Sequence, residues 1–496
     1  HSPHVCGMNL EQYVQHFAPN VRCERRLGRG RILIAARALR CGEIVLTAKP
    51  LLSIGTPSPG SEAAVLFQRV ASWCEKYSDS CSQREVGTIW GAFHSLLSSQ
   101  VPRAWPLPTC AVDVQEQVFL LHSSGRQPSA LTKRLKAAFR LSLPAIQLEQ
   151  LMDIWEMNAF GHTAHEDVLS LFFVPSLANH SCLPTVSWYV HEETIFFRAI
   201  ADLAVGDEIT DSYLDEEELL ASTPHRRRKL IEGGKAFTCS CLRCSALLDT
   251  SRGVPCPRCS TGVVYLGPEE SSAASLPAQQ RLEHQTSPCT TCGHMLKHGD
   301  YSVPLKAESD AEALLEQVHS LPRRRRTQAL DHLQVLMTPC LGKTTHWLWR
   351  SMHGLLKDRS EARGDIIAEL TFLDWRAAFV HQALEGFLRA PRRVLPCPSH
   401  ALECERAAQL YLQLGSSSAS RISYSVALQK ARRRLHECLA ILTPMFSAKD
   451  GDVRRAAALL RSVESAMRIR RRAARRHCRN RPQWRLKVLR SAQWKK

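Results

Sequence analysis

Cysteines are concentrated in one part of this 496-residue chain, with spacings that suit metal binding. Seven of the 19 cysteines fall within 54 residues, as one C-x-C-x2-C run and two C-x2-C pairs: Cys239, Cys241, Cys244, Cys256, Cys259, Cys289 and Cys292. Nothing at the N-terminus resembles a secretory signal, so we interpret these cysteines as metal ligands in a reducing compartment and not as disulfides. The two C-x2-C pairs have the two-knuckle spacing of a zinc ribbon, and the low-complexity segment 269–280 lies between them.

Polar and aromatic residues with possible catalytic roles precede this cluster. The run 176–182 reads Ser-Leu-Ala-Asn-His-Ser-Cys, and Tyr213 follows Cys182 by 31 positions in Gly-Asp-Glu-Ile-Thr-Asp-Ser-Tyr. Near the start, residues 27–30 read Leu-Gly-Arg-Gly, a glycine loop that allows backbone to approach a ligand closely. Together with the first cysteine run, and in this order, these motifs resemble the SET domain, over residues 21–245.

Other features of the chain resemble the SET and MYND domain (SMYD) family of lysine methyltransferases more particularly. These are the helical insertion inside the SET region, the segment Asn158-Ala159-Phe160 and the helical C-terminal third. The resemblance implies a SET pseudoknot beside a site for S-adenosylmethionine, with Phe237 stacked on the adenine, as an aromatic face packs well on a purine. It implies cofactor contacts from Gly28, Arg29, Gly30, Asn158, Asn179, His180 and Phe237.

Tyr213 is the predicted catalytic residue. A free lysine has a pKa near 10.4, so about one amine in a thousand is a neutral nucleophile at pH 7. An enclosed, partly apolar channel favours the neutral amine, and a phenol at its inner end can align that amine for attack. We therefore predict that Tyr213 positions the substrate amine and does not act as an ionised general base.

Zinc is the metal that we expect in the cysteine cluster. Cys182 can complete Cys239, Cys241 and Cys244 as a closed tetrahedral site that holds the segment after the SET domain, including Phe237, over the cofactor. A second zinc is expected at Cys256, Cys259, Cys289 and Cys292. We expect no MYND finger in this chain, because residues 51–155 hold only Cys74, Cys81 and Cys110. An alternative is that His1, His4 and Cys6 are the end of a finger located upstream.

The elements that must position these residues change character along the chain. Residues 31–36 and 43–48 predict an opening β-hairpin, 185–190 and 195–199 a second one, and residues 61–158 have helical periodicity. The resulting fold class is α+β. We expect an N-terminal segment 1–20, the SET parts 21–50 and 159–236, a helical insertion 51–158, the cysteine cluster 237–300, a helical domain 301–467 and a basic tail 468–496.

Charge and hydropathy bound the possible partners. The net charge is +18, but residues 468–496 carry 13 Lys or Arg and no acidic side chain, so the rest of the chain carries only +5. The tail predicts nuclear localisation, weak nucleic-acid contact or no selected role. No apolar run approaches the roughly 20 residues of a membrane span, so we expect a soluble, monomeric protein without membrane contact.

These observations predict a protein-lysine N-methyltransferase that acts on a histone or non-histone protein in gene regulation, in the nucleus and cytoplasm. Partner proteins are expected on the helical C-terminal domain. The alternatives are a non-catalytic SET-fold adaptor with zinc modules and a nucleic-acid-binding zinc protein. In the adaptor, Gly28–Gly30 is a plain turn, Asn179 and His180 are structural, and Tyr213 is a core tyrosine.

Overall fold

The chain forms two compact units in the computed structural model. The structure describes residues 4–5, 8–77, 83–98, 114–162, 167–246, 248–267, 286–296, 298–318, 320–388, 393–394, 397–417 and 422–479. The first unit comprises residues 1–352 and 378–396, and the second comprises 353–377 and 397–496. The described strands all belong to the first unit, so the molecule has the α+β class that the sequence predicted.

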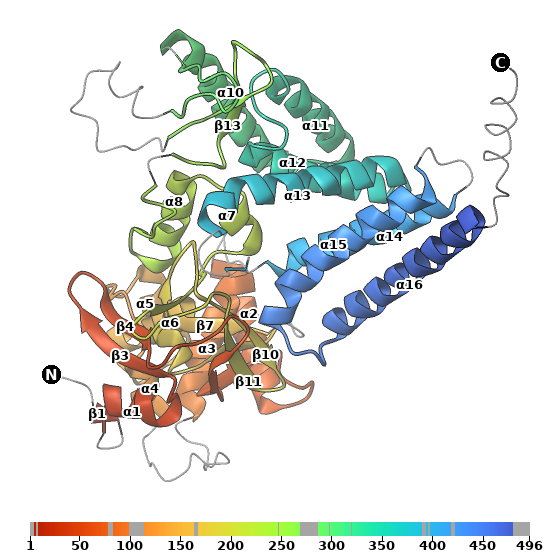
Figure 1. The fold of residues 1–496 in the computed structure, drawn as a ribbon. Coiled ribbons are helices and arrows are strands. Elements are labelled where there is room, and N and C mark those ends of the chain that lie inside the picture. Colours follow the sequence, from red (N-terminus) through yellow and green to blue (C-terminus); the bar gives the residue numbers. More distant parts are fainter. Residues whose placement is uncertain are drawn as a thin grey trace, which may run out of the picture. The chain divides into compact units, whose positions relative to one another are not determined.

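A four-stranded sheet joins three distant parts of the first unit, and Figure 1 labels two of its strands, β3 and β4. Its order is β3-β4-β12-β9, and the bounds are β3 Val21–Arg26, β4 Gly30–Ala35, β12 Glu208–Asp211 and β9 Asn179–His180. Strands β12 and β9 are parallel, with Thr210 opposite Asn179 and Asp211 opposite His180. This pairing places the predicted cofactor residues of β9 beside the strand that leads to Tyr213.

Two three-stranded sheets complete the SET region. Their orders are β10-β11-β5 and β6-β8-β7, with β5 Ile44–Ala48, β6 Leu52–Ile54, β7 Ala159–Gly161, β8 Leu169–Leu171, β10 Val186–His191 and β11 Thr194–Ala199. The predicted hairpin of 185–190 with 195–199 is confirmed by the antiparallel pairing of β10 with β11.

The predicted hairpin of residues 31–36 with 43–48 is wrong. Strand β4 pairs with the preceding strand β3, and β5 pairs with β11. The Cys41-Gly42 turn is held by another segment, because the Cys41 N–H donates to the Asp202 carboxylate at 2.8 Å and the Gly42 N–H donates to the Ala199 carbonyl at 2.7 Å. The alternation of apolar and charged residues in Val21-Arg22-Cys23-Glu24 was the missed sequence signal of a strand, and Val21 and Cys23 are the buried members.

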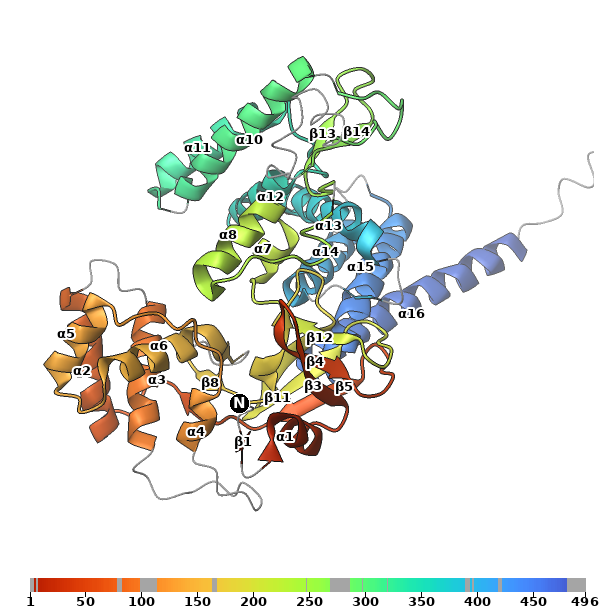
Figure 2. The ribbon, with the colours of Figure 1, turned by 90° about the vertical axis from the view of Figure 1, so that its left-hand side faces the viewer.

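The predicted helical insertion is confirmed and forms a cluster to one side of the strands (Figure 2). Its helices are α2 Glu62–Tyr77, α3 Gln83–Ser98, α4 Val114–Phe119, α5 Ala130–Phe139 and α6 Ala145–Asn158. Helices α3 and α6 approach closely, since a Cβ on Gly91 would lie 2.4 Å from the Trp155 ring. The Trp155 indole N–H donates to Ser95 Oγ at 2.9 Å in the same contact. This packing fixes the end of α6 and therefore Asn158.

Short elements lead from the sheet to the cysteine cluster. They are α7 Glu216–Leu220, α8 Pro224–Lys235, β13 Gly253–Pro255 and β14 Val263–Tyr265. Thr223 caps α8 by accepting the Arg226 N–H, and Pro224 suits the first helical turn. The helix ends where Ala236 adopts a left-handed conformation with φ 59°. That turn directs Phe237 and the following cysteines back toward the sheet.

The remaining described elements are mostly helices. They are β1 His4–Val5, β2 Met8–Asn9, α1 Leu10–Phe17, the 3-10 turn η1 Pro175–Leu177, α10 His298–Val318, α11 Arg323–Met337, α12 Trp347–Glu361 and α13 Ile366–Leu388. The second unit contains three further helices that lie side by side in Figure 1. They are α14 Pro398–Ser416, α15 Tyr424–Met445 and α16 Gly451–Arg479. Their apolar core includes Ala408, Tyr411, Leu428, Leu435 and Val463.

Two features of this helical part bear on the sequence predictions. Helix α16 continues past residue 468, so the first part of the predicted basic tail is helical, and residues 480–496 lie outside the described residues. The low-complexity segment 269–280 and residues His1 and Cys6 also lie outside them. Among the helices that the structure describes, none has the length and apolar character needed to cross a bilayer.

Candidate active site

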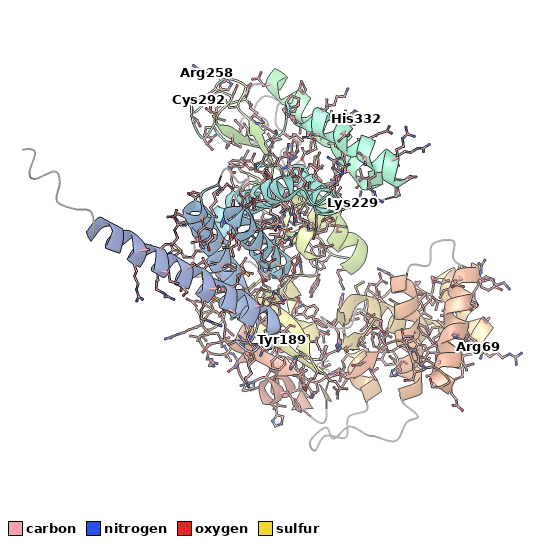
Figure 3. All side chains as sticks on the ribbon, turned by 90° about the vertical axis from the view of Figure 1, so that its right-hand side faces the viewer. Arg69, Tyr189, Lys229, Arg258, Cys292 and His332 are labelled. Carbon is pink, nitrogen blue, oxygen red and sulfur yellow. The ribbon has the colours of Figure 1, made fainter. Side chains whose placement is uncertain are left out.

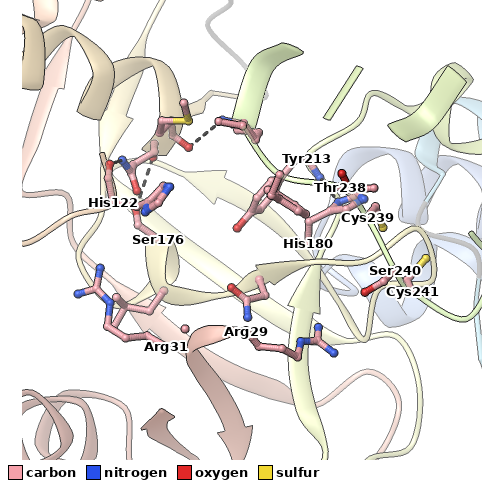
Figure 4. Close-up of a pocket in the computed structure, with 18 of the residues that line it drawn as sticks. Arg29, Arg31, His122, Ser176, His180, Tyr213, Thr238, Cys239, Ser240 and Cys241 are labelled. Carbon is pink, nitrogen blue, oxygen red and sulfur yellow. Dashed lines mark hydrogen bonds between the residues drawn. The ribbon is translucent and has the colours of Figure 1, made fainter. Parts of the chain in front are cut away.

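A pocket of about 550 Å³ in the first unit is lined by residues from six segments of the chain (Figure 4). All eight residues that the sequence predicted for cofactor binding and catalysis line it: Gly28, Arg29, Gly30, Asn158, Asn179, His180, Tyr213 and Phe237. They come from the β3–β4 turn, the end of α6, strand β9 and the segments after β12 and α8. The sheet pairing and the helix ends described above therefore bring the predicted residues together.

The glycine turn presents open backbone to this pocket. Gly28 and Gly30 have φ values of +74° and +68°, in the left-handed region that favours glycine. A Cβ added at either residue would meet no atom within 4 Å, so the conformation and not close packing requires glycine here. The space beside this turn is available to a ligand.

Glu208 holds two of the predicted cofactor residues and was not identified from the sequence. Its Oε1 lies 3.1 Å from Nη2 of Arg29 and accepts a hydrogen bond from Nδ2 of Asn179 at 3.2 Å. Glu208 begins β12, so the strand that leads to Tyr213 also orients the glycine turn and β9. Its place in the Gly-Asp-Glu segment was the only signal in the sequence.

Asn158 is held by its own chain. Its amide nitrogen donates to the carbonyls of His122 and Ile154, each at 2.8 Å. The amide protons are thus in use, and the side-chain oxygen is what remains for a ligand. His122 also lines the pocket, although no motif in the helical insertion had marked it. Burial lowers the pKa of His122, so its imidazole is neutral near pH 7.

Hydrogen bonds link Tyr213 to His180 and to the cysteines. The Tyr213 N–H donates to Nδ1 of His180 at 3.0 Å, so the neutral ring carries its proton on Nε2, 3.3 Å from Sγ of Cys182. Burial lowers the pKa of His180 to about 4, which keeps the ring neutral. His180 therefore lines the pocket and also contacts Cys182, one of the predicted zinc ligands.

The Tyr213 phenol remains protonated. Its hydroxyl donates to the Ala178 carbonyl at 2.6 Å. Burial raises its pKa, and the negative charges of Asp211 and Glu208 raise it further. The phenol oxygen can still accept a hydrogen bond, which is the property needed to position an amine. This state agrees with the predicted positioning role and argues against an ionised base.

Two further charged groups lie near Tyr213. Nζ of Lys235 donates to the carbonyls of Glu156 and Met157, at 3.0 and 2.7 Å, and lies 5.4 Å from the centre of the Tyr213 ring. Lys235 lines the pocket and had no role assigned from the sequence. Asp211 is buried, and its Oδ1 has no hydrogen-bond partner among the described residues. Burial raises the pKa of Asp211 to about 7.

Phe237 lies at the rim of the pocket. Its side chain is 38% exposed, the ring centre is 6.3 Å from that of His180, and it meets the Tyr213 ring edge-on at 6.4 Å. An exposed aromatic face next to a pocket can stack on a planar ligand group.

The post-SET tetrad, Cys182, Cys239, Cys241 and Cys244, is assembled as predicted. Its four Sγ atoms all lie within 4.8 Å of one another, with Cys182 at 4.0 Å from Cys239 and 3.5 Å from Cys244. Zinc–sulfur bonds of about 2.3 Å in tetrahedral geometry place sulfur atoms about 3.8 Å apart. The donors and their spacing therefore fit one zinc ion. Arg228 ties α8 to this site by donating to the Cys239 and Cys244 carbonyls, at 3.2 and 2.9 Å.

The ribbon tetrad, Cys256, Cys259, Cys289 and Cys292, fits a second zinc ion by the same measure. Its Sγ atoms lie within 4.8 Å, with Cys256 and Cys292 at 3.7 Å and Cys259 and Cys289 at 3.7 Å. The first knuckle lies between β13 and β14, which pair in an antiparallel ribbon. In Figure 3, Cys292 lies beside Arg258 at the outer end of this ribbon, and both are exposed.

Comparison with known proteins identifies the region around the pocket. Residues 30–214 match the SET domain family model. The chain is 30% identical over 142 residues to the protein-lysine N-trimethyltransferase SMYD5 of Gallus gallus, covering 26% of this chain and 32% of that protein. It is 39% identical over 69 residues to the histone-lysine N-methyltransferase SMYD3 of Homo sapiens, covering 14% of this chain and 15% of that protein.

The matched parts span about a third of SMYD5 and less of SMYD3. Among solved structures, the SET domain of LSMT bound to lysine and AdoHcy aligns with a TM-score of 0.30 and 14% identity, over 80% of this chain and 91% of that chain. The family model and the SMYD relatives confirm the resemblance found in the sequence. The chain therefore contains a SET domain over residues 30–214 and is similar to members of the SMYD family over part of its length.

Proposed function

We propose that this chain is a protein-lysine N-methyltransferase that uses S-adenosylmethionine. The observation that carries the proposal is the convergence of all eight predicted residues on one pocket of the SET domain. The SMYD relatives, which bear the names of lysine methyltransferases, support the same reaction. S-adenosylmethionine supplies a methyl group on a cationic sulfonium, and the chain supplies binding, alignment and the exclusion of water.

The residues of the pocket suit the different parts of this cofactor. The left-handed turn at Gly28 and Gly30 leaves backbone groups accessible, and Arg29 can meet a carboxylate. Asn179, oriented by Glu208, offers its amide oxygen to a donor. Phe237 provides the exposed aromatic face for the adenine.

Tyr213 would position the substrate amine. Because the Tyr213 hydroxyl donates its hydrogen bond to the Ala178 carbonyl, the phenol oxygen can accept a hydrogen bond from an N–H of the neutral amine. The amine lone pair is then free to attack the methyl carbon, and such alignment is a main source of rate. Methyl transfer would form the nitrogen–carbon bond as the carbon–sulfur bond breaks, and the product ammonium would then release a proton to water. The nearby ammonium of Lys235 would favour the neutral form of the incoming amine by like-charge repulsion.

Zinc in the post-SET tetrad would support this site structurally. Cys239 and Cys241 line the pocket, and Nε2 of His180 contacts Sγ of Cys182. Thiolates held by a zinc ion would fix the segment that carries Phe237.

The wider role rests on the sequence. We propose a protein substrate, histone or non-histone, and a function in gene regulation in the nucleus and cytoplasm. Partner binding on the C-terminal helices, weak nucleic-acid contact through the basic tail and a monomeric state are further predictions of the sequence.

The direct test is a calorimetric titration of S-adenosylmethionine into the wild-type chain and Asn179→Ala, followed by transfer of labelled methyl groups to histones and other proteins. We expect binding to the wild type, weakening of at least about tenfold in Asn179→Ala, and label on lysine. Loss of one hydrogen bond to a charged group, about 1.5–3 kcal/mol, corresponds to such a change. Absence of cofactor binding by the folded wild type would overturn the proposal.

The alternative is an adaptor that has the same fold but transfers no methyl group. The hydrogen bond from the Tyr213 hydroxyl to the Ala178 carbonyl favours it, because a buried tyrosine with only a structural role needs a partner for its hydroxyl. Tyr213→Phe separates the two functions, with Tyr189→Phe on strand β10 as the matched control. The enzyme should lose methyl transfer only in Tyr213→Phe, with both variants folded and binding cofactor. An adaptor should bind partners equally in all three proteins and transfer no methyl group.

A further inference from the structure

A third group of metal-ligand side chains lies in the helical second unit. His400 and Cys404 are one turn apart on α14, and Glu437 reaches them from α15. The ligand atoms of these three residues lie within 4.8 Å of one another. His400 and Cys404 are buried, and the Glu437 side chain is 12% exposed. Such a combination of donors in an apolar helix interface needs an explanation.

The distances suit a tetrahedral metal ion. Nε2 of His400 is 3.4 Å from Oε1 of Glu437 and 3.9 Å from Sγ of Cys404. Zinc bonds of about 2.0–2.1 Å to nitrogen and oxygen and about 2.3 Å to sulfur give separations of about 3.4 and 3.6 Å at tetrahedral angles. The two cysteine tetrads of the same chain have comparable spacings, 3.5 to 4.0 Å.

Surrounding residues orient these donors as the outer partners of a metal site do. Oε2 of Glu403 lies 3.5 Å from Nδ1 of His400, which is the arrangement of a carboxylate–histidine–zinc triad. Arg434 donates to Oε2 of Glu437 at 2.9 Å and leaves Oε1 directed at His400. Arg376 in turn donates to Oε1 of Glu403 at 2.7 Å. Glu403 therefore holds the second ring nitrogen of His400, and Arg434 holds the second carboxylate oxygen of Glu437.

The competing explanation is a protonated histidine held between Glu403 and Glu437. Burial alone would lower the pKa of His400, but Cys404, Glu403 and Glu437 together raise it well above its ordinary value. A proton and a metal ion can occupy the same set of donors, because each neutralises the buried carboxylates. The thiol favours the metal ion, because Glu403 and Glu437 already suffice to hold a protonated histidine, whereas a cysteine sulfur beside Nε2 of His400 is a preferred ligand of zinc.

We propose that Nε2 of His400, Sγ of Cys404 and Oε1 of Glu437 bind a zinc ion that joins α14 to α15. A mixed nitrogen, sulfur and oxygen donor set suits zinc among the common divalent ions. Three protein ligands leave a fourth position for water. The site lies within the second unit and does not depend on the methyltransferase proposal.

The test is the zinc content of the purified full-length chain, measured by mass spectrometry and by release to a colorimetric chelator. Cys404→Ala should contain one zinc ion fewer than the wild type. Cys438→Ala, which removes the buried cysteine next to Glu437 on α15, is the matched control and should contain the wild-type amount. Methyl transfer and cofactor binding, measured on the same samples, report separately on the pocket.

Equal zinc in the wild type and Cys404→Ala, with both proteins folded, would overturn the proposal and leave a protonated histidine. Should Cys404→Ala fail to fold, Glu437→Gln provides the same comparison with nearly the same shape. It should also lose one zinc ion, and wild-type zinc in Glu437→Gln would likewise reject the site. Substitution of cobalt into the wild type should add a tetrahedral thiolate absorption that is weaker in Cys404→Ala than in Cys438→Ala, and equal spectra would count against the site.

Discussion

The two cysteine tetrads have the same donors and nearly the same spacing, but their surroundings differ. In the post-SET tetrad, Cys182 comes from the SET core and lies 57 positions before Cys239, and two members line the pocket. In the ribbon tetrad each knuckle is local, Cys292 is exposed, and no member is among the residues that line the pocket. Equal ligand chemistry can therefore have unequal consequences for function.

The difference follows from what each metal would connect. A zinc ion in the post-SET tetrad would close a long loop of chain. It would also be linked to the active site, because its ligand Cys182 contacts His180, and His180 accepts the Tyr213 N–H. A zinc ion in the ribbon tetrad closes short loops around β13 and β14. We expect the first site to determine cofactor binding and the second to determine only local folding.

The largest effect should follow from opening the post-SET tetrad. Cys244→Ser should lose one zinc ion and weaken cofactor binding by more than about 100-fold, because the segment around Phe237 is no longer fixed and metal binding is coupled to folding here. Calorimetry with S-adenosylmethionine and zinc analysis measure both quantities. Cofactor affinity within a few-fold of wild type, despite the lost zinc, would remove the distinction between the two tetrads.

A buried ion pair next to the ribbon should be the next most important element. Arg252 precedes β13 and donates to Glu308 of α10 at 3.0 and 2.6 Å, and the Trp347 indole donates to Glu308 Oε1 at 2.9 Å. Glu308→Gln leaves Arg252 buried and poorly compensated, so we expect a loss of about 3–5 kcal/mol of stability with zinc content unchanged. Glu312→Gln, one turn away and more exposed, is the control. Urea denaturation midpoints of the two variants should differ clearly, and equal midpoints would show that zinc alone stabilises this region.

Asp211 should make the stability of the pocket region depend on pH. Its folded pKa of about 7 exceeds the unfolded value of about 3.9, so the unfolded state releases its proton first as pH rises. Stability from this group is therefore present below about pH 4, falls between pH 4 and 7, and stays low above pH 7. Asp211→Asn should remove this cost and stabilise the protein at pH 8 by up to about 4 kcal/mol. Denaturation midpoints at pH 6 and pH 8 test this, and a variant that is no more stable than wild type at pH 8 would contradict the assignment.

Much of this site was predictable because its residues belong to ordered motifs. Gly28–Gly30, Asn179, His180, Tyr213 and the eight cysteines form sets whose spacing is visible in the sequence, and the structure brings each set together. Strand partners were less predictable, because the local pattern at 31–36 and 43–48 does not reveal that β5 pairs with β11. Pairing partners depend on the contacts of the whole sheet.

The residues that were missed act through distant contacts. Glu208 orients Arg29 and Asn179, and His122 reaches the pocket from the helical insertion, and no spacing pattern in the sequence assigned a role to either residue. The same holds for His400, Cys404 and Glu437, where a one-turn pair on one helix meets a single carboxylate from the next. Helical residues one turn apart share a face, but only the packing of α14 on α15 supplies the third donor.

The smallest effect on cofactor binding should come from the ribbon tetrad, and it completes the contrast with Cys244→Ser. Cys289→Ser should lose one zinc ion while the dissociation constant for S-adenosylmethionine changes by less than about threefold, an energy of about 0.6 kcal/mol. Gly262→Ala offers an independent route to the same site, because its Cβ would lie 2.2 Å from Sγ of Cys289 and 2.9 Å from Thr291. Both variants should become sensitive to proteolysis between β13 and α10 while methyl transfer persists. If either variant lost cofactor binding as completely as Cys244→Ser, the ribbon would be part of the active-site support, and the two tetrads would form one cooperative structure.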